Sequence, residues 1–123
     1  MKAKVFLLVA LISTLGTLNA LAHNETKSFK VYGNCGMCEK RIETAAQSID
    51  GVVSADWDKK TKQIKVVYNP HTADIKQVHK AIAKAGHDTE MIRAKDEAYN
   101  KLPGCCQYDR APVKKVDHSS HKH

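Results

Sequence analysis

Apolar residues recur with two different periods between residues 28 and 92, which predicts a chain that alternates between strands and helices. In the segment 28–32, Phe29 and Val31 alternate with polar neighbours, and the segments 53–58 and 64–68 repeat this two-residue period. The segments 38–49 and 75–85 instead carry apolar residues three and four positions apart, which predicts one apolar face of a helix in each. The segment 89–92 is expected to form a short last strand.

Turn and cap residues separate these segments. Asp50 and Gly51 end the first predicted helix. Thr72 or Asp74 is placed to cap the second, and Gly86 terminates it. The resulting order is strand, helix, strand, strand, helix, strand. We therefore predict an α+β protein with a ferredoxin-like βαββαβ sandwich, in which a four-stranded antiparallel sheet carries both helices on one face.

The first 22 residues have the layout of a secretory signal peptide. Lys2 and Lys4 precede an apolar run, and the segment ends in small residues at Ala20 and Ala22. Polar residues interrupt the run, which keeps it shorter than the roughly 20 apolar residues that a membrane-spanning helix needs. We expect cleavage after Ala22 and a periplasmic or secreted product.

The composition describes one small, mildly basic domain. Without the signal, 101 of the 123 residues remain, which is enough for a single hydrophobic core. The formal net charge of the full chain is +7, yet its basic residues are spread along the chain and not gathered with aromatic residues, so we expect no nucleic-acid partner. No grouping of acid, base and nucleophile appears, so we do not expect an enzyme. We expect a monomer.

Four cysteines form two tight pairs, Cys35/Cys38 and Cys105/Cys106. A C-x-x-C sequence is compatible with a metal clamp, a redox couple or half of a disulfide framework. Cys38 lies at the predicted start of a helix, where the helix dipole and backbone N–H groups favour a thiolate. Two thiolates on one loop suit a soft ion that accepts few ligands, such as Cu(I) or Hg(II), whereas Zn(II) prefers four.

The helical and strand periods end after Arg93. Residues 94–110, which contain Pro103 and Gly104, form a Cys-Cys extension, and residues 111–123 form a histidine-rich tail that we expect to be disordered. The vicinal pair Cys105/Cys106 has several open roles. It can complete a four-sulfur site with the C-x-x-C pair, form a second metal site or a dimer contact, or form a disulfide to Cys35 or Cys38.

Four sequence matches in the right order point to a known family. They are G-N-C-G-M-C-E-K-R-I-E at 33–43, I-D-G-V at 49–52, I-K-V-V-Y-N-P at 64–70 and A-I-A-K-A-G-H at 81–87. On these motifs, residues 27–93 resemble the heavy-metal-associated domain. This module occurs in copper chaperones, in the amino-terminal repeats of copper-pumping ATPases and in the periplasmic mercury-binding protein of mercury resistance.

The resemblance implies that Cys35 and Cys38 bind the metal, with Cu(I) as the expected ion and Hg(II) or Zn(II) as alternatives. It also implies a partner that is a metal-transporting membrane protein or another metallochaperone. In the family, the loop after the second helix lies beside the C-x-x-C loop, which makes His87 a candidate third ligand. Met37, between the cysteines, is a candidate thioether ligand, and Cys105 and Cys106 are further candidates.

The sequence departs from the family pattern at two places. Gly33 and Asn34 precede the first cysteine where the family usually has Met-Thr or Met-His, and His87 stands where it often has tyrosine or phenylalanine. Because a C-x-x-C pair in an oxidising compartment can also form a disulfide, two other functions stay open, a thiol-disulfide redox protein and an interaction domain whose cysteines are bridged. Two further histidines, His71 and His79, are expected to face solvent.

Overall fold

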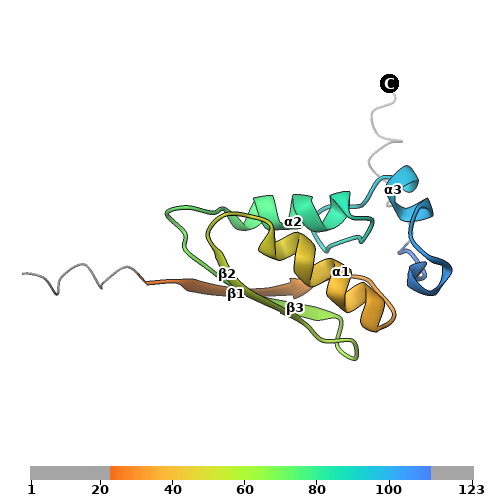
Figure 1. Ribbon diagram of the computed structural model, residues 1–123, viewed down its shortest axis with the longest axis horizontal. Helices are drawn as coiled ribbons and strands as arrows, with labels where there is room; N and C mark the ends of the chain where they lie inside the picture. The colour runs from red at the N-terminus through yellow and green to blue at the C-terminus, as the bar shows by residue number, and fades with distance from the viewer. Residues whose placement is uncertain (1–22, 112–123) are drawn as a thin grey trace, which may run out of the picture.

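The computed structural model describes residues 23–111 (Figure 1). The predicted signal at 1–22 and the tail from residue 112 onward lie outside the described residues. Along the chain, the elements are β1 (Glu25–Lys30), α1 (Gly36–Gln47), β2 (Val52–Trp57), β3 (Gln63–Tyr68), α2 (Ile75–Lys84), α3 (Asp96–Asn100) and the short 3-10 helix η2 (Gly104–Cys106). No helix of this described part combines the length and hydropathy needed to cross a bilayer.

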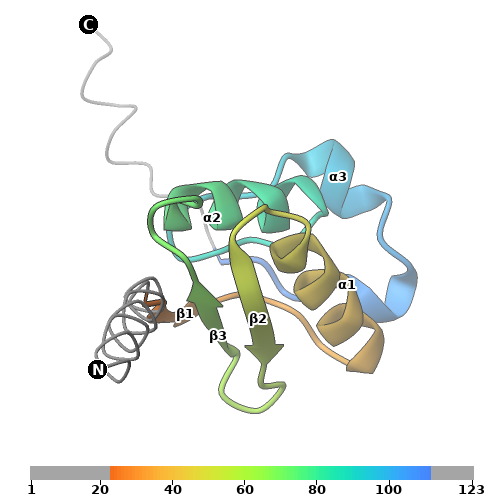
Figure 2. The ribbon, with the colours of Figure 1, turned by 60° about the vertical axis from the view of Figure 1, so that its left-hand side comes forward.

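The sheet is antiparallel, with β3 in the centre and β1 and β2 at its edges. Ile64 of β3 pairs with Phe29 of β1 on one side and with Trp57 of β2 on the other. Helices α1 and α2 lie side by side over one face of the sheet (Figures 1 and 2). This arrangement confirms the predicted α+β class, with two main helices on one face.

The predicted fourth strand is wrong for the described residues. The segment 89–92 contributes a single bridge between Thr89 and Val31, so the sheet has three strands. The hydroxyl of Thr89 accepts hydrogen bonds from the backbone N–H groups of Met91 (3.1 Å) and Ile92 (2.9 Å). Because these donors are used inside a tight turn, they are not available to a strand neighbour.

The core fills the space between the sheet and the two helices. The buried strand positions alternate as predicted for β1 and β3, but Val53 of β2 is 61% exposed. A register shift between Val52 and Ser54 reverses the expected direction of this side chain. The large core side chains are Phe29, Val31, Ile42, Trp57, Ile64, Val66, Tyr68, Val78 and Ile82.

Helix α2 begins with a capping box at Asp74, which is one of the two cap residues that the sequence offers. The Asp74 carboxylate accepts a hydrogen bond from the N–H of Lys76, and the Gln77 side chain accepts one from the N–H of Asp74. The predicted exposure of His71 is confirmed, but that of His79 is wrong. His79 stacks on Phe29 with ring centroids 3.8 Å apart, and its Nδ1 lies 2.7 Å from the Thr89 hydroxyl.

Two buried histidines make the stability of the fold depend on pH. Burial lowers the pKa of both His79 and His87 below the value of about 6.5 expected in the unfolded chain. Below that pH the unfolded state therefore binds more protons than the folded state, and stability is lost as the pH falls. Each histidine contributes up to about 1.4 kcal/mol per pH unit within this window.

Denaturant unfolding of the reduced, metal-free protein is expected to give a lower free energy of unfolding at pH 5.5 than at pH 7. A His79→Gln variant removes one titrating group and is expected to reduce the difference between the two pH values. An equal difference in the variant and the wild-type protein would show that His79 does not stay neutral in the folded state.

Candidate metal centre

The cysteines Cys35 and Cys38 lie where the loop after β1 turns into α1. Cys35 is the N-cap residue of α1 with an extended backbone, and Cys38 lies in the first turn with its side chain fully buried. Their sulfur atoms are 3.7 Å apart. A side chain at Gly33 would approach both Cys38 and the Trp57 ring to 3.1 Å, so the space at this position favours glycine over the larger residue usual in the family.

Three consecutive carbonyl groups hold the loop that leads to Cys35. The indole N–H of Trp57 donates to the Val31 carbonyl at 3.0 Å. The ammonium group of Lys62 donates to the Gly33 carbonyl at 2.7 Å. Between them, the Tyr32 carbonyl receives a hydrogen bond from His87, described below. Side chains from three separate parts of the chain therefore fix the backbone path of residues 31–35, which we call the metal loop.

The pKa of Cys35 is lowered to about 7. The main cause is the backbone N–H of Cys38, which points toward the sulfur at the start of α1 and stabilises a thiolate there. Partial desolvation opposes this effect, and the N–H of Met37 adds to it. Cys35 is partly exposed, so a nucleophilic sulfur is presented to an incoming ion near neutral pH.

The Cys-Cys extension brings two more sulfur atoms to the same place. Figure 2 shows the blue C-terminal segment reaching the amino-terminal end of α1. The sulfur of Cys106 lies 4.0 Å from that of Cys35, and the sulfur atoms of Cys35, Cys105 and Cys106 all lie within 4.8 Å of one another. All four cysteines are free thiols.

The two cysteines of the vicinal pair face different environments. Cys106 is fully buried, and this burial, together with the neighbouring thiol of Cys38, raises its pKa above the usual range. Cys105 is exposed, and its sulfur lies 3.6 Å from the Met37 sulfur, which is itself on the surface. The structure thus gathers the four predicted cysteines and Met37 at one end of the molecule.

The remaining candidate ligand, His87, is not part of this sulfur group. Its ring is fully buried and stacks on Tyr108 with centroids 5.4 Å apart. Nδ1 lies 2.8 Å from the Tyr32 carbonyl, and because a carbonyl only accepts, Nδ1 carries the proton. Nε2 has no hydrogen-bond partner among the described residues. In this arrangement His87 positions the loop before Cys35.

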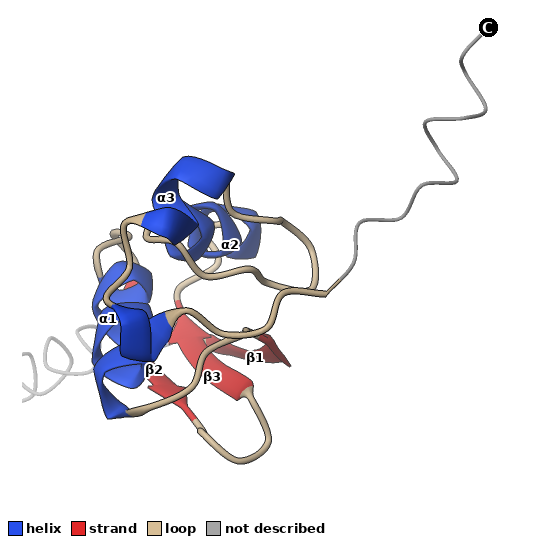
Figure 3. Ribbon diagram, turned by 90° about the vertical axis from the view of Figure 1, so that its right-hand side faces the viewer, coloured by secondary structure: helices blue, strands red, loops and turns tan. Residues whose placement is uncertain are grey.

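Tyr108 docks the extension onto the loop after α2. Its hydroxyl donates to the Gly86 carbonyl and accepts from the backbone N–H of Asp88, both at 2.8 Å. Tyr99 lies edge-on to the Tyr108 ring and donates its hydroxyl to the Tyr108 carbonyl at 2.6 Å. Figure 3 shows α3, which carries Tyr99, beside α2.

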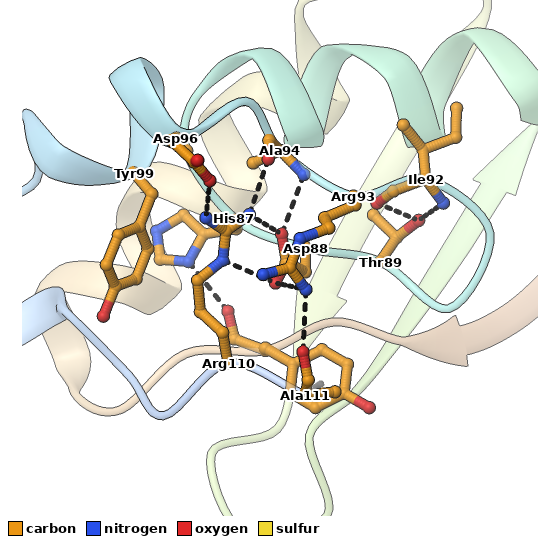
Figure 4. Close-up of polar contacts among 12 residues, drawn as sticks. His87, Asp88, Thr89, Ile92, Arg93, Ala94, Asp96, Tyr99, Arg110 and Ala111 are labelled. Carbon is orange, nitrogen blue, oxygen red and sulfur yellow. Dashed lines mark hydrogen bonds and ion pairs between the residues drawn. The ribbon is translucent and has the colours of Figure 1, made fainter. Parts of the chain in front are cut away.

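Arg110 completes this attachment through a pair of ion contacts (Figure 4). Its guanidinium binds both carboxylate oxygens of Asp88, at 2.7 and 3.0 Å, and the carboxylate of Asp96 at 2.8 Å. Sequence reasoning missed these residues as part of the site. Their only signal was the presence of tyrosines and an arginine in a segment that otherwise lacks periodic apolar positions.

Two paired thiols on a strand-to-helix loop, carried by this three-stranded sheet and two helices, define a small cysteine-based metal-binding domain. Residues 30–88 match the model of the heavy-metal-associated domain, and the chain belongs to that family. The matched region ends at Asp88, so the pair Cys105/Cys106 lies outside it.

The comparisons with known proteins point to copper-handling relatives. Copper chaperone CopZ of Staphylococcus aureus is 36% identical over 55 residues, which make up 45% of this chain and 81% of the chaperone. A solved CopZ metallochaperone is 33% identical with a TM-score of 0.52, and the match covers 53% of this chain and 98% of that one. The Cu(I)-loaded amino-terminal domain of a potential copper-translocating P-type ATPase from Bacillus subtilis is 30% identical with a TM-score of 0.51, covering 54% and 84% respectively.

Replacing Arg110 by alanine is expected to release the extension. The change leaves the buried Asp88 carboxylate without its main partner, which costs roughly 1–3 kcal/mol of stability. Cys106 then becomes accessible, and its alkylation by iodoacetamide is expected to accelerate. Denaturant unfolding and mass spectrometry of the alkylated protein measure the two effects.

Arg93→Ala is the matched control for this experiment. Arg93 contacts the same Asp88 carboxylate at 3.9 Å and donates to the Ala111 carbonyl at 2.7 Å, but both contacts are made from an exposed position, so its loss is expected to cost less than about 1 kcal/mol. If Cys106 is alkylated at the same rate in Arg110→Ala and in the wild-type protein, Arg110 does not hold the segment.

Proposed function

We propose that the protein is an exported carrier that binds Cu(I) through Cys35 and Cys38 and either sequesters the ion or hands it to another protein. The observation that carries this proposal is the pair of thiols 3.7 Å apart at the start of α1, one of them partly exposed with a pKa lowered to about 7. Thiolates are the ligands that Cu(I) prefers. Hg(II) and Zn(II) are the alternative ions.

The asymmetry of the two thiols supports transfer by ligand exchange. Cys38 is fully buried and Cys35 is partly exposed, so an incoming thiolate meets the ion on the Cys35 side. A soft ion with few ligands accepts an additional thiolate before it loses the first, and it passes from one protein to the other without being released into water. The expected recipient is a metal-transporting membrane protein or another metallochaperone.

The names of the similar proteins support copper over the other soft ions. The curated relative is a copper chaperone, and one of the similar structures is a domain in its Cu(I)-loaded state. The first is named as a chaperone of copper, and the second is a domain of a potential copper-translocating ATPase. The function we propose is the binding and transfer of an ion, and it is not enzymatic.

One observation favours a second function, that of a thiol-disulfide redox protein. Cys35 combines a lowered pKa with two neighbouring sulfurs, Cys38 at 3.7 Å and Cys106 at 4.0 Å. A reactive thiol beside a resolving thiol is the arrangement that disulfide exchange needs. A redox protein is expected to show a defined reduction potential and turnover with a dithiol donor, whereas a metal carrier is expected to show no turnover.

Anaerobic titration of the reduced protein with Cu(I), against a competing chelator, tests the proposal. We expect one tightly bound equivalent, and we expect its loss when Cys35 and Cys38 are both replaced by serine. Native mass spectrometry counts the bound ions. Unchanged Cu(I) binding in the double variant would rule out this site, and parallel titrations with Hg(II) and Zn(II) rank the alternative ions.

Export is tested on the full chain expressed in a bacterial host. The signal-like layout of residues 1–22 predicts a mature protein that begins at His23 and is recovered outside the cytoplasm. Cell fractionation followed by intact-mass measurement reads both features. A variant in which Lys2 and Lys4 are replaced by glutamate is the control and is expected to accumulate uncleaved. Full-length wild-type protein in the cytoplasm would contradict export.

A further inference from the structure

We infer that Cys106 is a third thiolate ligand of the ion bound by Cys35 and Cys38, supplied by the C-terminal extension, so that the site retains a three-coordinate ion. This inference rests on the proposed function and deepens it. The extension lies outside the region that matches the family model, so the third ligand is a feature of this chain's own C-terminal segment.

The sulfur separations fit a three-coordinate ion. A metal–thiolate bond of about 2.3 Å puts two sulfurs about 4.6 Å apart when they lie on opposite sides of an ion, and about 4.0 Å apart at the corners of a triangle around it. The sulfur of Cys35 lies 3.7 Å from that of Cys38 and 4.0 Å from that of Cys106. The separation of Cys35 and Cys106 equals the side of this triangle, and that of Cys35 and Cys38 is slightly shorter.

Cys106 is placed to supply the third ligand from the interior of the protein. Its side chain is fully buried, as is that of Cys38, and its sulfur lies 4.0 Å from that of Cys35. A buried thiol without a role behaves as a small apolar side chain and packs against carbon. Cys106 is part of the hydrophobic core, but its sulfur also lies close to that of Cys35, which is separated from it by 71 residues of sequence.

The extension is anchored independently of the sulfurs, so the third ligand is preorganised. Tyr108 and Arg110 attach the segment to Gly86 and Asp88, and Cys106 itself is held in the short helix η2 by its N–H donating to the Pro103 carbonyl at 2.8 Å. An ion that arrives at Cys35 therefore finds the third sulfur in place and does not have to order the segment.

The neighbouring Cys105 provides a matched comparison within the same turn. Its sulfur also lies within 4.8 Å of those of Cys35 and Cys106, but Cys105 is exposed and contacts Met37, whereas Cys106 is buried. The inference therefore assigns different roles to two adjacent cysteines of identical chemistry. Substitution of either cysteine removes one thiol, but only the loss of Cys106 removes the proposed third ligand.

The third thiolate changes how the protein handles the ion. With two ligands, an incoming thiolate fills an empty coordination position, but with three it has to displace Cys106 first. Release then becomes slow, which favours retention over rapid delivery. The site also suits ions that are satisfied by three thiolates, Cu(I) and Hg(II), better than Zn(II), which prefers a fourth ligand.

The experiment compares the wild-type protein, Cys106→Ala and Cys105→Ser after loading each with one equivalent of Cu(I). X-ray absorption spectroscopy counts the sulfur ligands, and competition with bicinchoninate measures affinity and the rate of release. We expect three sulfurs in the wild-type protein and in Cys105→Ser, and two sulfurs at a shorter bond length in Cys106→Ala. Affinity is expected to fall roughly ten- to a hundredfold in Cys106→Ala, as when a supporting group at a metal site is lost.

Two results would overturn the assignment. One is a count of two sulfurs in the wild-type protein, which needs no variant and holds even if Cys106→Ala fails to fold. The other is an equal loss of affinity in Cys105→Ser and Cys106→Ala, with circular dichroism showing both folded. If the wild-type protein binds no Cu(I) at all, the proposed function itself fails, and the inference of a third ligand fails with it. The nearly isosteric Cys106→Ser repeats the test with less change in volume.

Discussion

The position of the metal loop depends on three hydrogen bonds to three consecutive carbonyl groups. The carbonyls of residues 31, 32 and 33 accept from Trp57 in β2, from His87 after α2 and from Lys62 in the β2–β3 turn. These donors come from separate parts of the fold, so the loop is held only when the sheet and the second helix are both in place. The direction in which α1 leaves the sheet, and with it the placement of Cys35 and Cys38, follows from this constraint.

Two adjacent residues connect this loop to the C-terminal extension. His87 binds the Tyr32 carbonyl before the first cysteine, and the next residue, Asp88, binds Arg110 through both carboxylate oxygens. The loop after α2 therefore contacts the metal loop on one side and the segment that carries Cys106 on the other. Because interactions within one contiguous network are coupled, a change at Asp88 is felt at both cysteine pairs.

The elements that repeated apolar spacing specifies were predictable from the sequence. The features that depend on one or two individual side-chain contacts were not. Three of the strands, both helices and a cap at Thr72 or Asp74 follow from repeated apolar spacing and local chemistry, which many residues specify together. The loss of the fourth strand depends on one hydroxyl, that of Thr89, and the burial of His79 depends on the same group and on Phe29. Periodicity carries no information on such contacts.

The candidate site divides in the same way. The C-x-x-C pair was visible because its spacing and its place before a helix are local properties of the sequence. The approach of Cys106 depends on Tyr108 and Arg110 meeting residues about 22 positions earlier in the chain, and no local pattern encodes that meeting. The segment also buries Leu102 and Tyr108 in the core, so a partner that displaces it has to break apolar as well as polar contacts. In the carrier that we propose, the contacts that hold the extension control both the retention and the release of the ion, although they lie at a distance from the sulfur atoms.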